Sequence, residues 1–170
     1  GVMSAFATFW IGFLARPLGG MIFGHLGDRI GRKKTLITTL ILMGICTTAI
    51  GFLPTYNTIG IAAPILLIIL RLIQGIAMGG EWGGAVVLAA EHSPKGNELI
   101  YSAFAQQGSP VGNLLATSIF FGFSFLPDEQ FLTWGWRVPF LLSAFLVITG
   151  LWIRLGVEES PVMKQLQESK

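Results

Sequence analysis

The sequence predicts an all-α polytopic transmembrane helix bundle, and three observations support that class. Hydrophobic residues make up 52% of the 170-residue chain and charged residues only 12%, about half of the roughly 25% expected in soluble domains. The 22 glycines suit membrane helices, which pack closely through small residues. Apolar runs of about 20 residues recur along the chain, and each is long enough to cross a bilayer.

Five apolar segments are predicted to cross the membrane once each. The turns between them are short and contain proline or glycine, as at Pro54 and Gly60, at Pro94 and Gly96, and at Pro127. Because these connections are short, successive helices are expected to run antiparallel as neighbours. The predicted spans are residues 1–24, 35–53, 61–90, 101–126 and 137–155.

The first span carries Arg16 about 12 Å from its inner end. Such a side chain either extends to the cytoplasmic surface or faces the interior of the bundle. The span is followed by GHLGDRIGRKK, residues 24–34, which is rich in Lys and Arg. Short basic loops lie on the cytoplasmic side. This segment therefore predicts that residue 1 is outside and that residue 170 is cytoplasmic.

Residues 24–34 are expected to form a tight loop. Their glycines permit a chain reversal, and Asp28 lies where it can cap a helix or pair with Arg32. The alternative is that this loop only fixes the orientation of the chain in the membrane through its basic residues and has no further role. The second span, residues 35–53, contains the single cysteine, Cys46, which we interpret as a small packing residue.

The third span places strongly polar residues inside an apolar segment. At 100° per residue, Arg71, Gln74 and Glu81 share one helical face. Charges at the bilayer centre cost about 2.5 to 3.5 kcal/mol, so this face is expected to line a water-filled cavity. Arg71 and Glu81 are about 15 Å apart along the axis, and each needs its own partner. Two other faces carry glycines that admit neighbouring backbones: Gly75, Gly79 and Gly83, and then Gly80 and Gly84.

The spacing predicts that Glu81 lies near mid-membrane, where two roles are open. It is either a carboxylate that binds and releases a proton as the cavity opens, or a structural acid held by an arginine or a backbone donor of another helix. Arg71 likewise either attracts an anion and contacts the solute, or belongs to an ion pair that locks the bundle.

The fourth span carries Gln106, Ser109, Pro110 and Asn113 on one helical face. Pro110 frees a backbone carbonyl, which is tolerated in a membrane helix only where protein or cavity water can satisfy it. These residues predict a second wall of the substrate cavity. The alternative is a set of structural hydrogen bonds between helices.

The fifth span, residues 137–155, has Trp136 and Trp152 near its ends, where amphipathic rings prefer the membrane interface. After it, residues 156–170 mix charges around Pro161 and show helical spacing. They predict an amphipathic cytoplasmic connector. An odd number of spans followed by a connector predicts the partial N-terminal half of a larger bundle, with the C-terminal half missing.

Several classes are disfavoured by the same residues. The chain has no HExxH-type motif and no grouping of a nucleophile with a base, so it is not predicted to be an enzyme. His25 and His92 lie in different loops and Cys46 is alone, so no metal or cofactor is expected. The basic residues orient the chain and form no aromatic-basic stripe, so no nucleic-acid partner is expected.

Several motifs resemble those of the major facilitator superfamily. GHLGDRIGRKKTL resembles its loop signature between the second and third helices, and RLIQGIAMGGEWGG resembles the fourth-helix signature of its metabolite:proton symporter branch. ARPLGG, EHSPKG, GWRVPFLLS and EESP are similar to that branch as well. The stretch DEQFLTWGWRVPF is most similar to shikimate-transporter-like members, and the resemblance runs nearly end to end.

The resemblance implies that the five spans are helices two to six of twelve. It implies a secondary active transporter of the plasma (inner) membrane that moves a small organic solute with protons by alternating access. The solute class would be an organic acid, such as shikimate or a dicarboxylate, or an osmolyte. Glu81 and Arg71, with Gln74 and Arg16, would serve proton coupling or the cavity. The residues implied in gating against the missing half are Gly24, Asp28, Arg29, Gly31, Arg32 and Lys33.

Two positions depart from the family pattern. After EHSPKG the family commonly has basic residues, but this chain has Asn97 and Glu98, which puts in doubt an inner pairing of Glu91. Asn113 stands where related sequences are often apolar, which bears on substrate preference. Two other functions stay open: a non-transporting membrane scaffold or sensor, in which the charges only lock the bundle, and a proton-independent facilitator.

Overall fold

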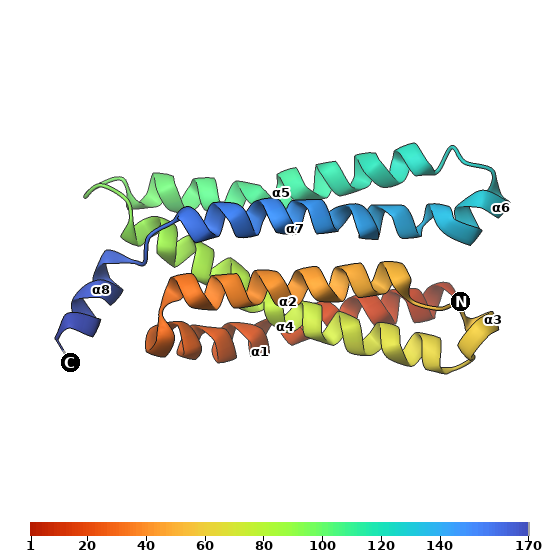
Figure 1. Cartoon of the computed structure of the whole chain (residues 1–170), viewed down its shortest axis with the longest axis horizontal. Coiled ribbons are helices and arrows are strands. Elements are labelled where there is room, and N and C mark those ends of the chain that lie inside the picture. The colour runs from red at the N-terminus through yellow and green to blue at the C-terminus, as the bar shows by residue number, and fades with distance from the viewer. Residues whose placement is uncertain (170) are drawn as a thin grey trace.

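The computed structural model describes residues 1–169, and within them every regular element is a helix. Five long helices lie side by side and form the bundle (Figure 1). Short helical elements cover its ends, and α8 leaves the bundle beside the C-terminus. The long helices are α1 (Val2–Ile30), α2 (Arg32–Phe52), α4 (Ala62–Glu91), α5 (Glu98–Phe123) and α7 (Arg137–Gly156). The short ones are α3 (Tyr56–Ile59), α6 (Asp128–Gln130), the π-helical turn η1 (Phe131–Gly135) and α8 (Pro161–Glu168).

Four of the long helices, α1, α2, α4 and α7, are long and apolar enough to cross a membrane. α5 is comparable in length at 26 residues. It is less apolar because it carries Gln106, Gln107, Ser109 and Asn113. The all-helical membrane class is confirmed, while the crossing by α5 stays a prediction.

The expected loop over residues 24–34 is wrong. α1 continues to Ile30 and α2 begins at Arg32, so Gly31 alone reverses the chain. Gly31 has φ 109°, a conformation that L side chains rarely adopt. Gly24 lies inside α1 instead. The apolar run indicates where lipid contact ends, but a helix can continue past that point because its backbone hydrogen bonds are made within the helix and do not depend on lipid.

α1 packs against α4 through glycines. A Cβ atom at Gly75 would overlap the carbonyl of Gly12, and one at Gly79 would overlap the carbonyl of Arg16. The reverse holds at Gly19, where a Cβ atom would overlap the backbone of α4. The expectation that this stripe admits a neighbouring backbone is confirmed at Gly75 and Gly79.

The other glycines of α4 have different surroundings. Gly80 lies against the side chain of Phe23, and Gly84 lies against the side chain of Leu36. These two therefore accommodate side chains of α1 and α2 rather than their backbones. A Cβ atom at Gly83 would meet nothing within 4 Å, so no packing contact of the described chain requires a glycine there.

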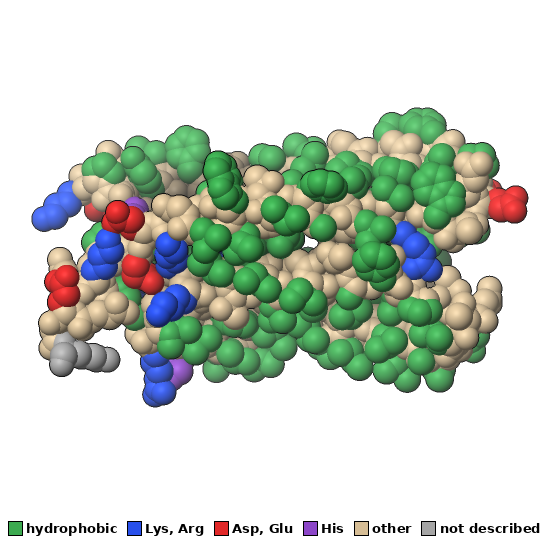
Figure 2. All heavy atoms as spheres, viewed as in Figure 1, with side chains coloured by type: hydrophobic (Ala, Val, Ile, Leu, Met, Phe, Trp, Pro, Cys, Tyr) green, Lys and Arg blue, Asp and Glu red, His purple; other side chains and the backbone are tan. Residues whose placement is uncertain are grey.

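Charged side chains gather at the ends of the bundle. Figure 2 shows most of the Lys, Arg, Asp and Glu side chains at the end where α8 lies, while the sides of the bundle are mainly apolar. The opposite end, with α3 and α6, holds the acidic residues Asp128 and Glu129 of α6. The basic end at α8 supports the predicted orientation with the C-terminus in the cytoplasm.

Candidate functional site

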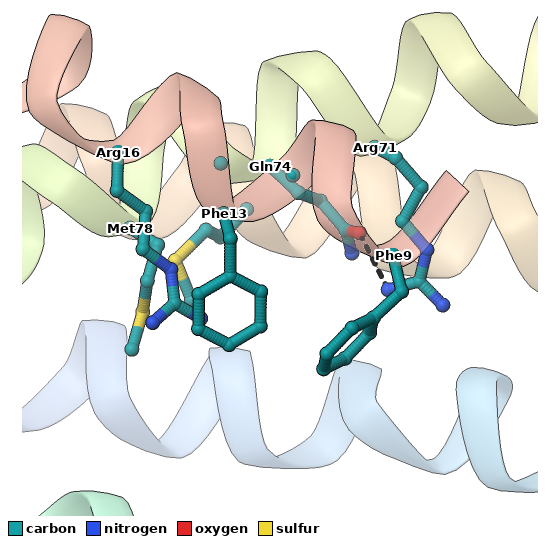
Figure 3. A pocket seen from close by; sticks show the side chains of 9 residues that line it. Phe9, Phe13, Arg16, Arg71, Gln74 and Met78 are labelled. Carbon is teal, nitrogen blue, oxygen red and sulfur yellow. Dashed lines mark hydrogen bonds between the residues drawn. The ribbon is translucent and has the colours of Figure 1, made fainter. Parts of the chain in front are cut away.

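A cavity of about 180 Å³ lies between α1 and α4, with Met43 of α2 on its wall. Arg71 and Gln74 of α4 line it, as their shared helical face predicts, and Met78 of the same helix lies beside them. Arg16 of α1 also lines it, so this arginine faces the bundle and does not extend to the surface. Figure 3 shows the two arginines at separate ends of the group of lining side chains.

Arg71 is held by a chain of hydrogen bonds. Its Nη1 donates to Oε1 of Gln74 at 3.2 Å, and Nε2 of Gln74 donates to Oγ1 of Thr47 at 2.6 Å. The Thr47 hydroxyl donates in turn to the backbone oxygen of Met43 at 2.8 Å. The chain fixes the Gln74 amide with its oxygen toward Arg71. The remaining N–H donors of Arg71 are left for other acceptors.

Arg16 is held differently. Its guanidinium carbon lies 4.0 Å from the centroid of the Phe13 ring, a cation–π arrangement. Within residues 1–169, neither Arg16 nor Arg71 forms a salt bridge with an acidic side chain. Two guanidinium groups therefore share one membrane cavity without an acidic partner from the described chain.

A second cavity, of about 550 Å³, adjoins the first. The two share Phe13, Arg16 and Met78, so Arg16 lies at their junction. The second cavity extends between α1 and α4 to Trp82, and it reaches Ser109 of α5. We call it the second lobe.

Of the predicted residues of α5, only Ser109 lines a cavity near the two arginines. Gln106 and Asn113 are exposed in the described chain and line neither the first cavity nor the second lobe. The structure therefore brings one of the three candidates of the fourth span to the site.

Glu81 lies outside both cavities and bridges three helices. Arg154 of α7 forms a two-point ion pair with its carboxylate, one contact being Nη1 to Oε2 at 2.9 Å. Thr39 of α2, which is fully buried, donates to the same oxygen at 2.7 Å. Arg154 also donates to the backbone oxygen of Leu36 at 2.6 Å. Glu81 is thus joined to α7 and α2 at once.

The partners of Glu81 lie near the α8 end of the bundle. Thr39 is only about 10 Å along α2 from its first residue, Arg32, and Arg154 is near the last residue of α7. Glu81 is therefore joined to the neighbouring helices toward that end of the bundle, and its depth in the membrane stays a prediction.

A second charge cluster lies where α1 meets α2. Arg32 pairs with Asp28 at 3.2 Å, the partner expected from the sequence, and with Glu91 of α4 at 3.2 Å. The hydroxyl of Ser160 donates to the other oxygen of Glu91. The inner pairing of Glu91 therefore exists, and Asn97 and Glu98 do not remove it.

Glu159 lies at the N-terminus of α2. Its Oε1 accepts hydrogen bonds from the backbone N–H groups of Arg32 and Lys33, each at 3.1 Å. A carboxylate in this position satisfies free N–H groups and complements the positive end of the helix dipole. The connector after α7 is thereby attached to the start of α2.

The connector contains a short helix, as predicted. Ser160 caps α8 by accepting a hydrogen bond from the Met163 N–H at 3.3 Å. Lys164 forms an ion pair with Glu158 and lowers the pKa of that carboxyl group, chiefly through their hydrogen bond. Of the remaining gating candidates, Lys33 donates a hydrogen bond from its ammonium group to the backbone oxygen of Leu155. Arg29 is exposed.

Several residues of these clusters were not singled out from the sequence. The structural alternative for Glu81 requires an arginine or a backbone donor of another helix, but nothing in the sequence selects Arg154. Thr39, Thr47 and Ser160 are small polar residues whose partners depend on helix packing. Glu159 is the second acid of the motif EESP, and its contact depends on where the start of α2 lies.

The model of the family described as "Sugar (and other) transporter" matches residues 3–169, nearly the whole chain. The chain belongs to this family. As a member, it is part of a multi-pass membrane protein, and the recognition of a major facilitator transporter is confirmed.

Curated relatives are similar over nearly the whole chain. The shikimate transporter of Escherichia coli K12 is 55% identical over 168 residues, which cover 98% of this chain and 38% of that protein. The inner membrane metabolite transport protein YhjE of the same strain is 51% identical, over 99% of this chain and 38% of its own length. The proline/betaine transporter of that strain is 44% identical, over 96% and 33%. The chain thus spans about two fifths or less of these relatives.

Solved structures confirm the fold. The proton:xylose symporter XylE bound to 6-bromo-6-deoxy-D-glucose superposes with a TM-score of 0.81 at 21% identity, over 90% of this chain and 34% of that one. The partially occluded inward-open form of XylE from E. coli gives a TM-score of 0.83 at 20% identity, over 96% and 42%.

Proposed function

We propose that this chain is part of a secondary active transporter that moves an organic acid together with protons by alternating access. One observation carries the proposal: Arg16 and Arg71 present two guanidinium groups to one cavity and have no acidic partner within residues 1–169. Uncompensated charges inside a membrane protein are costly and mark solute or ion pathways.

The cavity suits a carboxylate. A guanidinium group presents several N–H donors in a planar fork that matches the two oxygens of a carboxylate. Because the cavity is lined by apolar side chains as well, the attraction is screened less than at an exposed surface. The similarity to the shikimate transporter supports an organic acid. The similarity to the proline/betaine transporter supports a zwitterionic osmolyte as the second candidate.

The proposed role of Glu81 is proton coupling through Arg154. Three donors, two from Arg154 and one from Thr39, stabilise the ionised carboxylate in this conformation. Arg154 is the one charged group of the described chain that contacts it. Protonation would remove the negative charge, release Arg154 and weaken the joint between α4 and α7. The same contacts also support the structural alternative, in which Glu81 only locks the bundle.

The cluster around Arg32 is the proposed cytoplasmic gate. It joins α1, α2, α4 and the connector through Asp28, Glu91 and Glu159. The partner in gating would be the rest of the transporter, consistent with the larger size of the curated relatives. Gly24, Arg29, Gly31 and Lys33 lie in or beside this cluster and are proposed to act with it.

The test is uptake by the full-length chain in membrane vesicles. Radiolabelled shikimate, succinate and proline would be offered with and without an imposed pH gradient, acidic outside. We expect accumulation of an organic acid that increases with the gradient. Uptake that ignores the gradient would establish a proton-independent facilitator. Absence of uptake of all three solutes, with the protein present in the membrane, would support the scaffold or sensor.

A further inference from the structure

α2 and α7 lie side by side and run antiparallel (Figure 1). Between their ends the two helices interlock through glycines. A Cβ atom at Gly44 of α2 would overlap the side chain of Val147, and one at Gly150 of α7 would lie 3.3 Å from Cδ2 of Leu40. These contacts fix how far α7 lies along α2, and the two ends of the pair are held by arginines of α7.

Arg137, the first residue of α7, binds the C-terminal end of α2. Its Nη1 donates to the backbone oxygens of Gly51 at 3.2 Å and Leu53 at 2.5 Å. The last carbonyl groups of a helix have no donors within the helix and carry partial negative charge, which a cation complements. The guanidinium carbon also lies 4.4 Å from the centroid of the Trp136 ring. Within residues 1–169 Arg137 forms no salt bridge, so the end of α2 supplies its acceptors.

Arg154 binds near the other end of α2. Its Nη1 donates to the backbone oxygen of Leu36 at 2.6 Å, in addition to the ion pair with Glu81 of α4. The two arginines are 17 residues apart (137 to 154), and their acceptors Leu36 and Leu53 are also 17 residues apart (36 to 53). This length of helix is about 25 Å, most of the roughly 30 Å core of a bilayer. The two contacts therefore match in spacing and are compatible with one alignment of α7 along α2.

A change in that alignment would disturb both arginine contacts together. Sliding α7 by one residue moves its side chains by about 1.5 Å along the axis, enough to take a hydrogen bond out of its normal range of lengths. Because Arg154 also holds Glu81, the alignment of α7 on α2 decides whether its guanidinium reaches that carboxylate. Arg137 lies at the opposite end of α7, so it can act on Glu81 only through this alignment.

We propose that Arg137 is a positioning residue, which fixes α7 along α2 and thereby keeps Arg154 at the carboxylate of Glu81. Within the described residues, α7 presents Arg154 to Glu81, α2 presents the neutral hydroxyl of Thr39, and neither α1 nor α5 forms an ion pair with it. The alignment itself follows from these contacts alone. Its effect on proton coupling rests on the proposed function of Glu81.

The first experiment tests the alignment by thermal unfolding of the full-length chain in detergent. Arg137→Ala removes one end contact, and Arg154→Met combined with Glu81→Gln removes the other without leaving a buried charge unpaired. Substitutions more than about 10 Å apart that share no partner usually have additive effects. We expect the loss of Tm in the triple variant to be smaller than the sum of the two separate losses, because either change alone already loosens the alignment.

The matched control for this coupling combines Arg137→Ala with Gly79→Ala. Gly79 lies at the contact of α4 with α1, so these two losses of Tm should add. Arg137→Lys should retain part of the stability, since lysine keeps the charge at the end of α2 but has no planar fork for two acceptors. Additive losses in the triple variant as well would overturn the proposal.

The second experiment measures coupling in membrane vesicles, with whichever of shikimate, succinate and proline the wild type accumulates. The quantity compared is the stimulation of uptake per molecule by an imposed pH gradient. Arg137→Ala should lower this stimulation several-fold and leave KM within about twofold, because Arg137 lines neither arginine cavity and a fully lost contact would cost more. In a Glu81→Gln background, Arg137→Ala should have no further effect on the stimulation.

Val147→Ala is the control for a loss of stability alone, since it removes side-chain contacts in the middle of the same helix pair and leaves both arginines in place. It should lower Tm but keep the stimulation. Unchanged stimulation in Arg137→Ala, or an equal loss in Val147→Ala, would contradict the positioning role. Wild-type uptake that ignores the gradient would instead refute the proposed proton coupling, and the unfolding experiment would still decide whether Arg137 fixes the alignment.

Discussion

The guanidinium of Arg154 holds the carboxylate of Glu81 although 73 residues separate them in the chain. The pair joins α7 to α4, and Thr39 extends the joint to α2. Its side chains are 24% and 14% exposed, so both charges are largely withdrawn from solvent. A pair of this kind is costly to break, because the remaining charge loses its partner.

Glu81→Gln should therefore lower the stability of the bundle by about 1 to 3 kcal/mol, since Arg154 keeps its charge but loses its acid. Thermal unfolding in detergent measures this change, and Arg154→Met combined with Glu81→Gln should recover part of it. If Glu81 couples protons, uptake per molecule of the variant should also lose its dependence on the pH gradient. A variant that is less abundant but keeps that dependence would identify a structural acid.

Arg71→Ala and Arg16→Ala should each raise KM for the transported acid by about tenfold to a hundredfold, because a charge-assisted hydrogen bond to the carboxylate is lost. Initial rates of uptake over a range of solute concentrations give KM. Lys95→Ala, at an exposed loop position away from both cavities, is the control. Equal KM values in all three variants would exclude the two arginines from solute binding.

Glu159→Ala should destabilise the start of α2 by about 1 kcal/mol, since two backbone N–H groups lose their acceptor. Hydrogen exchange of the first turn of α2 should become faster. Glu168→Ala, at the exposed end of α8, should leave that exchange unchanged. Similar protection in both variants would show that the carboxylate of Glu159 is not a cap.

Gly79→Ala should destabilise the protein by about 1 to 3 kcal/mol or more, because its Cβ atom would overlap the backbone of α1. Gly83→Ala, on the same helix, should be neutral or slightly stabilising, because the site is open and alanine favours helix. Thermal unfolding of both variants in one detergent decides the comparison. Equal losses would mean that the two helices are not packed as closely as described.

Much of the fold could be predicted from the sequence, because whether a helix can cross a bilayer depends on the hydrophobicity of about 20 consecutive residues. The apolar runs therefore located the long helices. The apolar runs did not predict the helix ends at the junction of α1 and α2, because α1 continues beyond its apolar run and α2 begins before its own. Only Gly31, with its positive φ, ends the helix there.

The candidate site could be predicted in part for a similar reason. Helical periodicity placed Arg71 and Gln74 on one face, and the structure finds both on one cavity. Their angular neighbour Glu81 faces Arg154 instead, since a face of about 100° is wide enough to meet two different neighbours. Which neighbour meets which residue depends on contacts between distant segments, and spacing along one helix does not contain that information.

The single-residue junction at Gly31 has a practical consequence for engineering the protein. With Glu159 directly beside it, an inserted peptide or tag at this position would separate α1 from α2 and detach the connector. Gly96, in the turn between α4 and α5, also has a positive φ but has nothing within 4 Å of a Cβ atom. An epitope or fluorescent reporter therefore belongs at the turn around Gly96, on the same side of the membrane, where it can report folding without disturbing it.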